Sequence, residues 1–516
     1  MRNDAEHRIR TVMQAIVVCI VVLLLTGFCF SQPSISLAPA SGPPTTSLRV
    51  SGSGFAPYAK IDIYFDTTDG ALAVANGSGS FSQIAVVAPV SARPGKHWVS
   101  AVQRSGQIGA QTPFSIQTAW SQFHRHNMIR RNWYENVLGV DNVANLQLKW
   151  SYDVGFTSSS PVVQDGVVYT GTYNGLLYAF DASTGAVLWT YQTASGGASY
   201  ASPAINNKKV YYGSLDGNVY ALNASTGAKV WSYLTGGAVY SSPTVISGVA
   251  YIGSNDGNLY ALNSSTGALL WKYATGGAVA STPAVADGVV YFGSNDGNAY
   301  ALNASSGAKL WSYYVGGNYT PDLFTQSPAV DNGLVYVGSG DADYLYALNA
   351  STGAKVWSQY IGSGFTPISS PAIALGVLYI GSGDGNLYAL NDKTGAVLWT
   401  YNTYNRVGTS PAVANGVVYF GTNNWILYAA DAITGAILWQ YDTTSVTDCS
   451  PVIADGVLYF CAGNTTFFTF GLPESAAEVA ADAATAKAPS LKTLQPDFTL
   501  KVSQPTAAAA VVGEGL

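Results

Sequence analysis

The sequence predicts an all-β protein: a closed eight-bladed β-propeller preceded by a small β-sandwich. Two columns of residues predict the propeller. A Ser-Pro or Thr-Pro pair returns every 40 to 45 residues, and a tryptophan returns at a similar interval. A period near forty residues that holds several short strands is typical of a propeller blade. Short alternating runs separated by Gly, Pro and Ser over residues 32–118 predict the sandwich.

The proline column marks eight repeats between residues 119 and 471. Its members are Pro161, Pro203, Pro243, Pro283, Pro328, Pro371, Pro411 and Pro451. Within a repeat, a segment such as "SPAVA" predicts the inner strand, "VVYFGS" the second, "LYALNA" the third and "LLWKYATG" the outer strand. The "NDGN" segment between the second and third strands predicts a tight hairpin, because Asn, Asp and Gly tolerate positive φ.

The tryptophan column predicts how the ring closes. Its members are Trp150, Trp189, Trp231, Trp271, Trp311, Trp357, Trp399 and Trp439. Trp150 precedes the first Ser-Pro pair, whereas the last repeat has no Trp-containing strand. We therefore expect "LQLKWSYDVG" to become the outer strand of the last blade, which removes the free edges of a linear array.

The chain divides into four segments. Residues 1–31 are typical of a secretory signal, because Arg2, Arg8 and Arg10 precede an apolar run. This run is close to the length of a membrane span, so a cleaved signal and a retained anchor both stay open. The sandwich occupies 32–118 and the propeller 119–471, and we expect the Ala-rich tail 472–516 to be disordered. The protein is therefore expected to be secreted or anchored at the cell envelope.

Composition excludes some partners and leaves two cysteines to explain. A net charge of −6 argues against nucleic acid, which needs a basic face. The one basic cluster, "HRHNMIRR" at 124–131, is interpreted as a solvated or strap-like segment. Outside the signal, Cys449 and Cys461 flank a hairpin turn centred on Asp455, which would place them opposite one another. A cross-strand disulfide is geometrically reasonable there, and a pair of buried free thiols is the alternative.

The repeat "DGVVYFGSNDGNAYALNASSGAKLW" resembles that of pyrroloquinoline-quinone (PQQ) propellers over about 350 residues. Its Ala-x-Asp/Asn-x-x-Thr/Ser-Gly-x-x-x-Trp portion resembles the tryptophan docking motif of that family. The resemblance implies that the eight tryptophans stack on neighbouring blades near a glycine. The family contains quinoprotein dehydrogenases, which hold PQQ and Ca²⁺ in the central channel, and scaffolds such as the outer-membrane assembly lipoprotein. The segment "SISLAPASGPPTTSLRVSGSGFAP" resembles immunoglobulin-like domains of the IPT/TIG class.

Catalysis is not expected on this scaffold. The dehydrogenases need an Asp base, a Glu or Asn for Ca²⁺ and a cation at the quinone, and their alcohol-oxidising members carry adjacent cysteines. This chain has no adjacent Cys pair and no Glu between Glu135 and Glu474, and its inner strands carry small neutral residues. We therefore predict no catalytic, cofactor-binding or metal-binding residue. PQQ and Ca²⁺ belong only to the alternative that the protein is a quinoprotein dehydrogenase.

Binding is expected where the repeats depart from their own pattern. The candidate binding face consists of Tyr200, Tyr240, Tyr319, Asp322, Phe324, Gln326, Tyr404, Arg406, Trp425 and Asp448. Exposed aromatic residues with few polar groups suit peptide or glycan recognition, and sequence drift is the alternative explanation. The predicted function is a non-catalytic, monomeric scaffold that binds an envelope or extracellular protein, peptide or glycan. It would contact the membrane only through its N-terminal segment, and a carbohydrate-binding surface protein is the second alternative.

Overall fold

The computed structural model describes residues 32–105, 108–122, 130–193, 200–316, 326–339, 343–362, 369–444, 449–462, 466–473, 488–491, 493–494, 496 and 500–503. The predicted signal, 1–31, lies outside these residues. The chain divides into unit 1 (1–92, 96–116 and 476–516) and unit 2 (93–95 and 117–475). Both are built from strands, with one short 3₁₀ turn, η2 (Val143–Asn145), among the described elements. No helix in the described part of the chain is long and apolar enough to cross a membrane.

Unit 1 consists of two sheets that share one core. The first sheet pairs β1 (Ser34–Ala38), β3 (Ser47–Ser53) and β6 (Phe81–Val87). The second contains, in spatial order, β2 (Ser41–Gly42), β8 (Gly109–Ile116), β7 (Gly95–Gln103), β4 (Lys60–Phe65) and β5 (Thr68–Val74). Val50, Ile63 and Phe114 are buried in the common core. The period-two alternation of the sequence thus places apolar side chains from both sheets on one interior.

Part of the C-terminal segment packs on unit 1. Leu494 is 7% exposed and belongs to a small cluster with Tyr64 and Val102. The backbone N–H of Ser503 donates to the carbonyl of Leu72 at 2.7 Å. The sequence predicted a disordered tail over 472–516, and these contacts were not expected, because a mainly polar and Ala-rich segment offers few apolar anchors.

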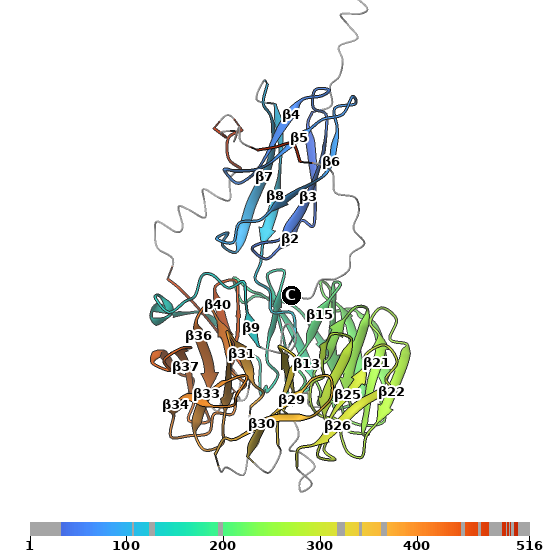
Figure 1. Ribbon diagram of the computed structural model, residues 1–516, viewed down its shortest axis with the longest axis vertical. Coiled ribbons are helices and arrows are strands. Elements are labelled where there is room, and N and C mark those ends of the chain that lie inside the picture. Colours follow the sequence, from blue (N-terminus) through green and yellow to red (C-terminus); the bar gives the residue numbers. More distant parts are fainter. Residues whose placement is uncertain are drawn as a thin grey trace, which may run out of the picture. The chain divides into compact units, whose positions relative to one another are not determined.

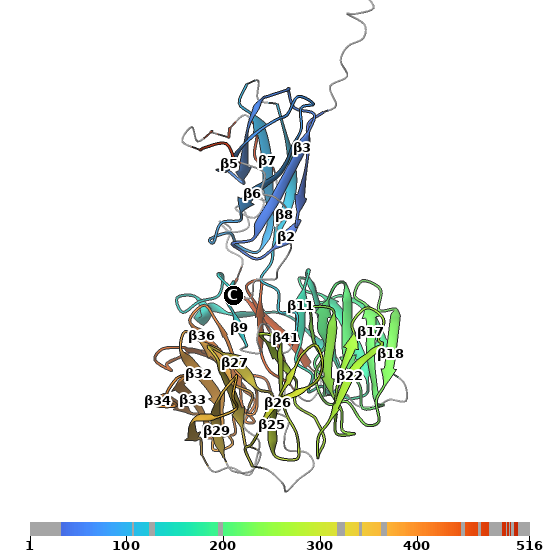
Figure 2. The same cartoon turned by 45° about the vertical axis from the view of Figure 1, so that its right-hand side comes forward.

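Unit 2 is a β-propeller whose described residues form eight sheets, which follow one another in chain order in Figure 1 and Figure 2. The inner strands are β11 (Val162–Gln164), β15 (Ala204–Asn206), β19 (Thr244–Ile246), β23 (Ala284–Ala286), β27 (Ala329–Asp331), β31 (Ala372–Ala374), β35 (Ala412–Ala414) and β39 (Val452–Ala454). The second strands are β12 (Val167–Gly171), β16 (Lys209–Gly213), β20 (Val249–Gly253), β24 (Val289–Gly293), β28 (Leu334–Gly338), β32 (Val377–Gly381), β36 (Val417–Gly421) and β40 (Val457–Cys461).

The two remaining positions of each sheet complete an antiparallel meander. The third strands are β13 (Leu176–Asp181), β17 (Asn218–Asn223), β21 (Asn258–Asn263), β25 (Asn298–Asn303), β29 (Tyr344–Asn349), β33 (Asn386–Asn391), β37 (Ile426–Asp431) and β41 (Thr466–Gly471). The outer strands are β14 (Val187–Gln192), β18 (Lys229–Leu234), β22 (Leu269–Ala274), β26 (Lys309–Tyr314), β30 (Lys355–Tyr360), β34 (Val397–Asn402), β38 (Ile437–Asp442) and β10 (Gln147–Asp153).

Turn residues fix the register of each meander. Asp287 and Gly288 connect β23 to β24 with φ values of 49° and 74°, as a two-residue hairpin turn requires. Between β20 and β21, Asp256 accepts a 3.0 Å hydrogen bond from the backbone N–H of Asn258 and a 2.5 Å bond from the hydroxyl of Tyr260. The carboxylate therefore ties the tip of the hairpin to its own strand.

Neighbouring sheets are joined by aromatic donors. Trp231 Nε1 and the Tyr211 hydroxyl donate to the same carbonyl, that of Ser264 in the next repeat, at 3.1 and 3.0 Å. A Cβ atom on Gly267 would lie 2.7 Å from Cδ2 of Trp231, so only glycine admits the indole this closely. The same indole-to-carbonyl bond recurs for Trp150, Trp189, Trp271, Trp311, Trp357 and Trp399. Trp439 instead packs against Phe470, at 5.1 Å between ring centroids.

Strand β10 completes the last sheet. It pairs antiparallel with β41, from Gln147 opposite Gly471 to Asp153 opposite Thr466. The spatial order of this sheet is β10-β41-β40-β39, so its outer strand comes from the N-terminal side of the chain. This is the strand exchange that the position of Trp150 predicts.

Candidate functional site

Hydroxyl groups of the Ser/Thr-Pro pairs form a closed ring at the inner strands. Each backbone N–H donates to the side-chain oxygen of the next member, at 2.9 to 3.3 Å, and Ser450 finally donates to Ser160. The members of this hydroxyl ring are Ser160, Ser202, Ser242, Thr282, Ser327, Ser370, Ser410 and Ser450, and all are buried. The serines and threonines at the inner strands are therefore occupied in holding neighbouring sheets together.

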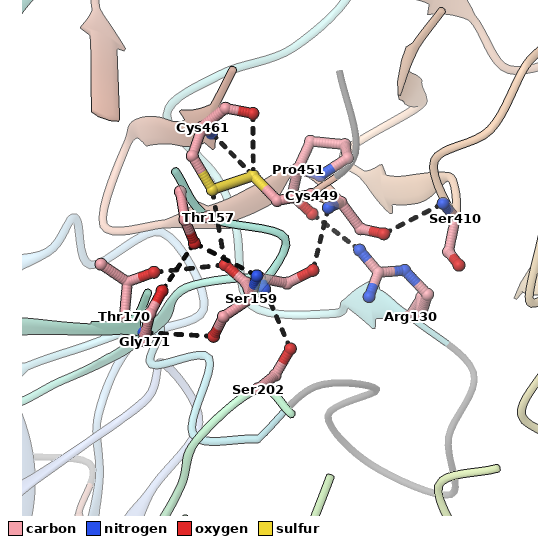
Figure 3. Close-up of a disulfide and its surroundings, with 12 residues drawn as sticks. Arg130, Thr157, Ser159, Thr170, Gly171, Ser202, Ser410, Cys449, Pro451 and Cys461 are labelled. Atoms are coloured by element: carbon pink, nitrogen blue, oxygen red, sulfur yellow. Dashed lines mark hydrogen bonds between the residues drawn. A yellow bond between two sulfur atoms is a disulfide. The ribbon is translucent and has the colours of Figure 1, made fainter. Parts of the chain in front are cut away.

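A disulfide lies where the ring closes. Cys449 and Cys461 are bonded and both fully buried, and Cys461 Sγ lies 3.4 Å from the carbonyl of Ser159 (Figure 3). Four other repeats carry at these two positions a hydroxyl residue and a glycine whose N–H donates to the hydroxyl oxygen, as Gly171 does to Ser159 at 3.1 Å. Ala201 and Gln326 hold the first position in two further repeats. The same pairing joins Gly293 to Ser281, Gly381 to Ser369 and Gly421 to Thr409. The last repeat keeps this bond, from the N–H of Cys461 to Cys449 Sγ at 2.8 Å, and adds the disulfide between the two side chains.

A strap, defined as residues 117–146, runs along the inner strands, and its described residues are 117–122 and 130–146. Trp120 and Val163 of β11 exchange two backbone hydrogen bonds of 2.8 Å. Farther along the strap, β9 (Arg131–Asn132) adds to β35 as a parallel strand. The strap therefore pairs with inner strands from both ends of the repeat array.

Arg130 is the buried cation of this strap. It is fully buried, and its guanidinium donates to the carbonyls of Pro411 at 2.7 Å and Pro451 at 2.8 Å, next to the hydroxyl ring (Figure 3). Burial lowers the pKa of Arg130 to about 9. The sequence predicts that the basic cluster is a solvated or strap-like segment, and Arg130 lies in a strap. Residues 124–129 of the cluster lie outside the described part of the chain.

Glu135 anchors the strap to the last sheet. Its carboxylate accepts backbone hydrogen bonds from Val137, Leu138 and Gly456 at 2.9 to 3.1 Å. Burial raises the pKa of Glu135, and these three bonds oppose that shift. The arrangement gives this carboxylate a structural role in holding the strap.

The predicted binding face is placed only in part. Tyr319, Asp322, Phe324 and Asp448 lie outside the described residues. Gln326 does not belong to an exposed face: it is 5% exposed and stands two residues before Pro328, in the column of Ser159 and Thr409. That column packs inward against the second strand of each sheet, which the loop context of Gln326 in the sequence did not reveal.

Tyr404, Arg406 and Trp425 stand on two loops that a backbone hydrogen bond joins. The carbonyl of Arg406 accepts a 2.9 Å hydrogen bond from the N–H of Asn423, two residues before Trp425. Tyr404 is 94% exposed and Trp425 is 48% exposed, whereas Arg406 is half-buried. Trp425 has a φ of 72° at a position where Gly257 and Gly297 stand in other hairpins, so a bulky residue occupies a backbone conformation that favours glycine.

Tyr200 and Tyr240 belong to a continuous row of four rings, which we call the aromatic ladder: Phe156, Tyr173, Tyr200 and Tyr240. Successive ring centroids lie 5.3, 5.6 and 5.3 Å apart. Phe156, Tyr173 and Tyr200 are 38–44% exposed. The rings come from the loop before β11, the β12–β13 hairpin and the loops before β15 and β19. Three consecutive sheets therefore contribute to one exposed aromatic surface.

Sequence reasoning missed half of this ladder. Tyr173 stands in the hairpin position that Asn255 and Asn295 occupy in regular repeats. This difference from the repeat pattern is visible in the sequence and could have identified Tyr173. Phe156 lies five residues before Pro161, at the position that Ala238 and Ala278 occupy before Pro243 and Pro283. Its backbone carbonyl accepts the N–H of Tyr173 at 2.7 Å, which brings the two rings together.

Comparison with known proteins identifies a family and a fold. The family model described as outer membrane protein assembly factor BamB matches residues 96–247, 236–342 and 320–498. No curated protein matches the chain. Quinohemoprotein alcohol dehydrogenase from Comamonas testosteroni is 16% identical, with a TM-score of 0.59 over 69% of this chain and 82% of that one. BamB from Moraxella catarrhalis is 18% identical, with a TM-score of 0.54 over 64% and 98%. A europium-containing methanol dehydrogenase is 14% identical, with a TM-score of 0.59 over 69% and 98%. At these identities the likeness concerns the fold, and the predicted all-β propeller class is confirmed.

Proposed function

Because the chain belongs to the family of outer membrane protein assembly factor BamB, we propose that it is an exported, non-catalytic propeller of eight blades that binds a protein or another ligand at the cell envelope. The proposal includes an immunoglobulin-like spacer at 32–118, tryptophan docking between blades and a monomeric state. The family description supports a protein partner and an extracytoplasmic location, and the eight described sheets support the number of blades.

The hydroxyl ring is the observation that carries the non-catalytic proposal. A bound quinone with Ca²⁺ would need carboxylate or amide oxygens for the metal and a cation directed at the quinone. Here the Ser and Thr oxygens accept backbone N–H groups, and Arg130 donates to two backbone carbonyls. Among the described residues, no three His, Cys, Asp or Glu side chains are grouped to hold a metal ion. These residues therefore do not fit PQQ with Ca²⁺.

Calorimetric titration of the signal-free protein with PQQ, with and without Ca²⁺, tests the proposal. We expect no binding at high micromolar PQQ in either condition. A quinoprotein dehydrogenase stripped of its cofactor serves as the positive control. Tight, calcium-dependent binding by this chain would overturn the proposal in favour of the dehydrogenase alternative.

A further inference from the structure

The outward face of the second sheet of unit 1 is buried. In β4 and β7, Ile63 and Ala101 point into the common core, so the alternating neighbours Asp62, Tyr64 and Ser100 point the other way. These three residues are only 0–1% exposed. An antiparallel sheet in a two-layer sandwich commonly leaves this face to water. Another part of the chain therefore covers it here.

The C-terminal segment, defined as residues 488–503, packs on this face with two leucines. Its described residues are 488–491, 493–494, 496 and 500–503. Leu494 is buried against Tyr64 of β4 and Val102 of β7, and Leu491 packs on the same cluster. The segment therefore presents a pair of apolar side chains, three residues apart, to the middle strands of the sheet.

Hydrogen bonds attach the segment near both of its ends. The side-chain amide of Gln111, on β8, donates to the carbonyl of Pro489 at 2.7 Å. At the other end, the N–H of Ser503 donates to the carbonyl of Leu72 on the edge strand β5 at 2.7 Å, and Val502 forms a parallel bridge with Leu72 (Figure 1). The segment thus reaches from β8 to the edge of the sheet.

The polar groups of this face are satisfied without the segment. Asp62 accepts hydrogen bonds from Arg104 Nε at 2.8 Å and Nη2 at 2.7 Å. Ser100 Oγ accepts one from the side-chain amide of Gln111 at 3.0 Å. That amide has a second N–H, which serves Pro489 and could serve water instead. These groups therefore keep partners when the segment leaves, as a preformed binding surface requires.

The cluster of Tyr64, Val102 and Leu494 is separate from the main core of unit 1, so loss of the segment leaves that core intact. Apolar pockets combined with a free sheet edge are a common way to bind an extended peptide. We propose that the outward face of this sheet is a peptide-docking surface and that the C-terminal segment is its releasable intramolecular ligand. Such a surface gives residues 32–118 a binding role beyond that of a spacer, whatever the propeller binds.

Competition for the face tests this proposal. In the signal-free full chain, Leu491→Asp combined with Leu494→Asp should release the segment, because carboxylates are costly in an apolar cluster. An end-blocked peptide of residues 488–503 is then titrated by calorimetry. We expect saturable binding to this double variant. Apparent binding to the unmodified chain should be at least about tenfold weaker, because its tethered segment competes at a high effective concentration.

Variants of the peptide and of the sheet show where the peptide binds. A peptide with Leu494→Asp should bind at least about tenfold more weakly, because it loses the burial of a leucine. A peptide with Val502→Ala should bind as the native peptide does, because the Val502 side chain is 41% exposed. Gln111→Ala, added to the double variant, should weaken the native peptide about threefold by removing the bond to Pro489.

Three results would overturn the proposal. Thermal unfolding of the double variant comes first: if this variant does not fold, the segment is an integral part of unit 1 and not a releasable ligand. The second is failure of the native peptide to bind the folded double variant at millimolar concentration, or equal binding of the peptide with Leu494→Asp. The third is an unmodified chain that is dimeric by light scattering and becomes monomeric in the double variant, which would place the segment on a second copy.

Discussion

The backbone N–H of Ser450 donates a 2.9 Å hydrogen bond to the side-chain oxygen of Ser160, although 290 residues separate them in the chain. This bond joins the last inner strand to the first. Each of the other seven bonds of the hydroxyl ring joins consecutive repeats, so the Ser450–Ser160 bond is the one that makes the ring cyclic.

Removing the hydroxyl at this junction should destabilise the fold. Ser160→Ala leaves the buried N–H of Ser450 without its acceptor, and we expect the free energy of unfolding to fall by about 1–3 kcal/mol. Ser160→Thr keeps an acceptor oxygen, as Thr282 does at its own ring position, and should be far milder. Urea unfolding compares the variants. Equal losses for Ala and Thr would show that packing, and not the hydrogen bond, is responsible.

The disulfide should add stability at the same junction. Reduction of Cys449–Cys461 should lower the free energy of unfolding by about 3 kcal/mol, because the bond closes a short loop that restricts the unfolded chain. The double variant Cys449→Ser and Cys461→Gly restores the residue types of other repeats and should not respond to reductant. Thermal unfolding with and without reductant measures both. An unchanged melting temperature of the oxidised protein on reduction would contradict the expectation.

Alkaline pH should unfold the propeller through its buried tyrosines. Burial raises the pKa of Tyr169 and Tyr291 to about 12, whereas a tyrosine in an unfolded chain ionises near pH 10. Between these values the unfolded state binds fewer protons than the folded state, so stability falls as pH rises from about 10 to 12. Unfolding free energies measured across this window test the slope. Tyr291→Phe should make it shallower, because it removes one of the buried hydroxyl groups that ionise only in the unfolded chain.

Trp425 should be replaceable by glycine with a gain in stability. Its φ of 72° is strained for a bulky residue, at a cost of about 1–3 kcal/mol, and part of this is recovered by a glycine that has no Cβ. We therefore expect Trp425→Gly to raise the melting temperature. Trp425→Ala keeps a Cβ in the strained conformation and should be less stable than the glycine variant. If both substitutions lower the melting temperature equally, the indole itself contributes packing that outweighs the strain.

The propeller could be predicted from the sequence because its residues repeat, whereas only two of the four residues of the aromatic ladder were predicted. Tyr200 and Tyr240 occupy equivalent positions in successive repeats, three residues before the proline, so the sequence alone relates them to one another. Phe156 stands at the position of Ala238 and Ala278, so it is a single aromatic departure with no repeated partner in the sequence. Its carbonyl accepts the N–H of Tyr173 as the carbonyl of Ala238 accepts that of Asn255.

The prediction that Gln326 belongs to an exposed binding face was wrong. Gln326 follows a long loop in the sequence, but residues two positions before the Ser/Thr-Pro prolines face the interior.

The sequence by itself determined the strands, their order within each sheet, the closing role of Trp150 and the residues available at the ring. These properties depend on local turn chemistry and on alternation, which a single repeat contains in full. Only the tertiary structure decided that Arg130 is buried beside the hydroxyl ring and that four aromatic rings from three sheets meet. Those contacts join residues from different repeats, and their distances depend on how successive sheets are placed around the ring, which no single repeat specifies.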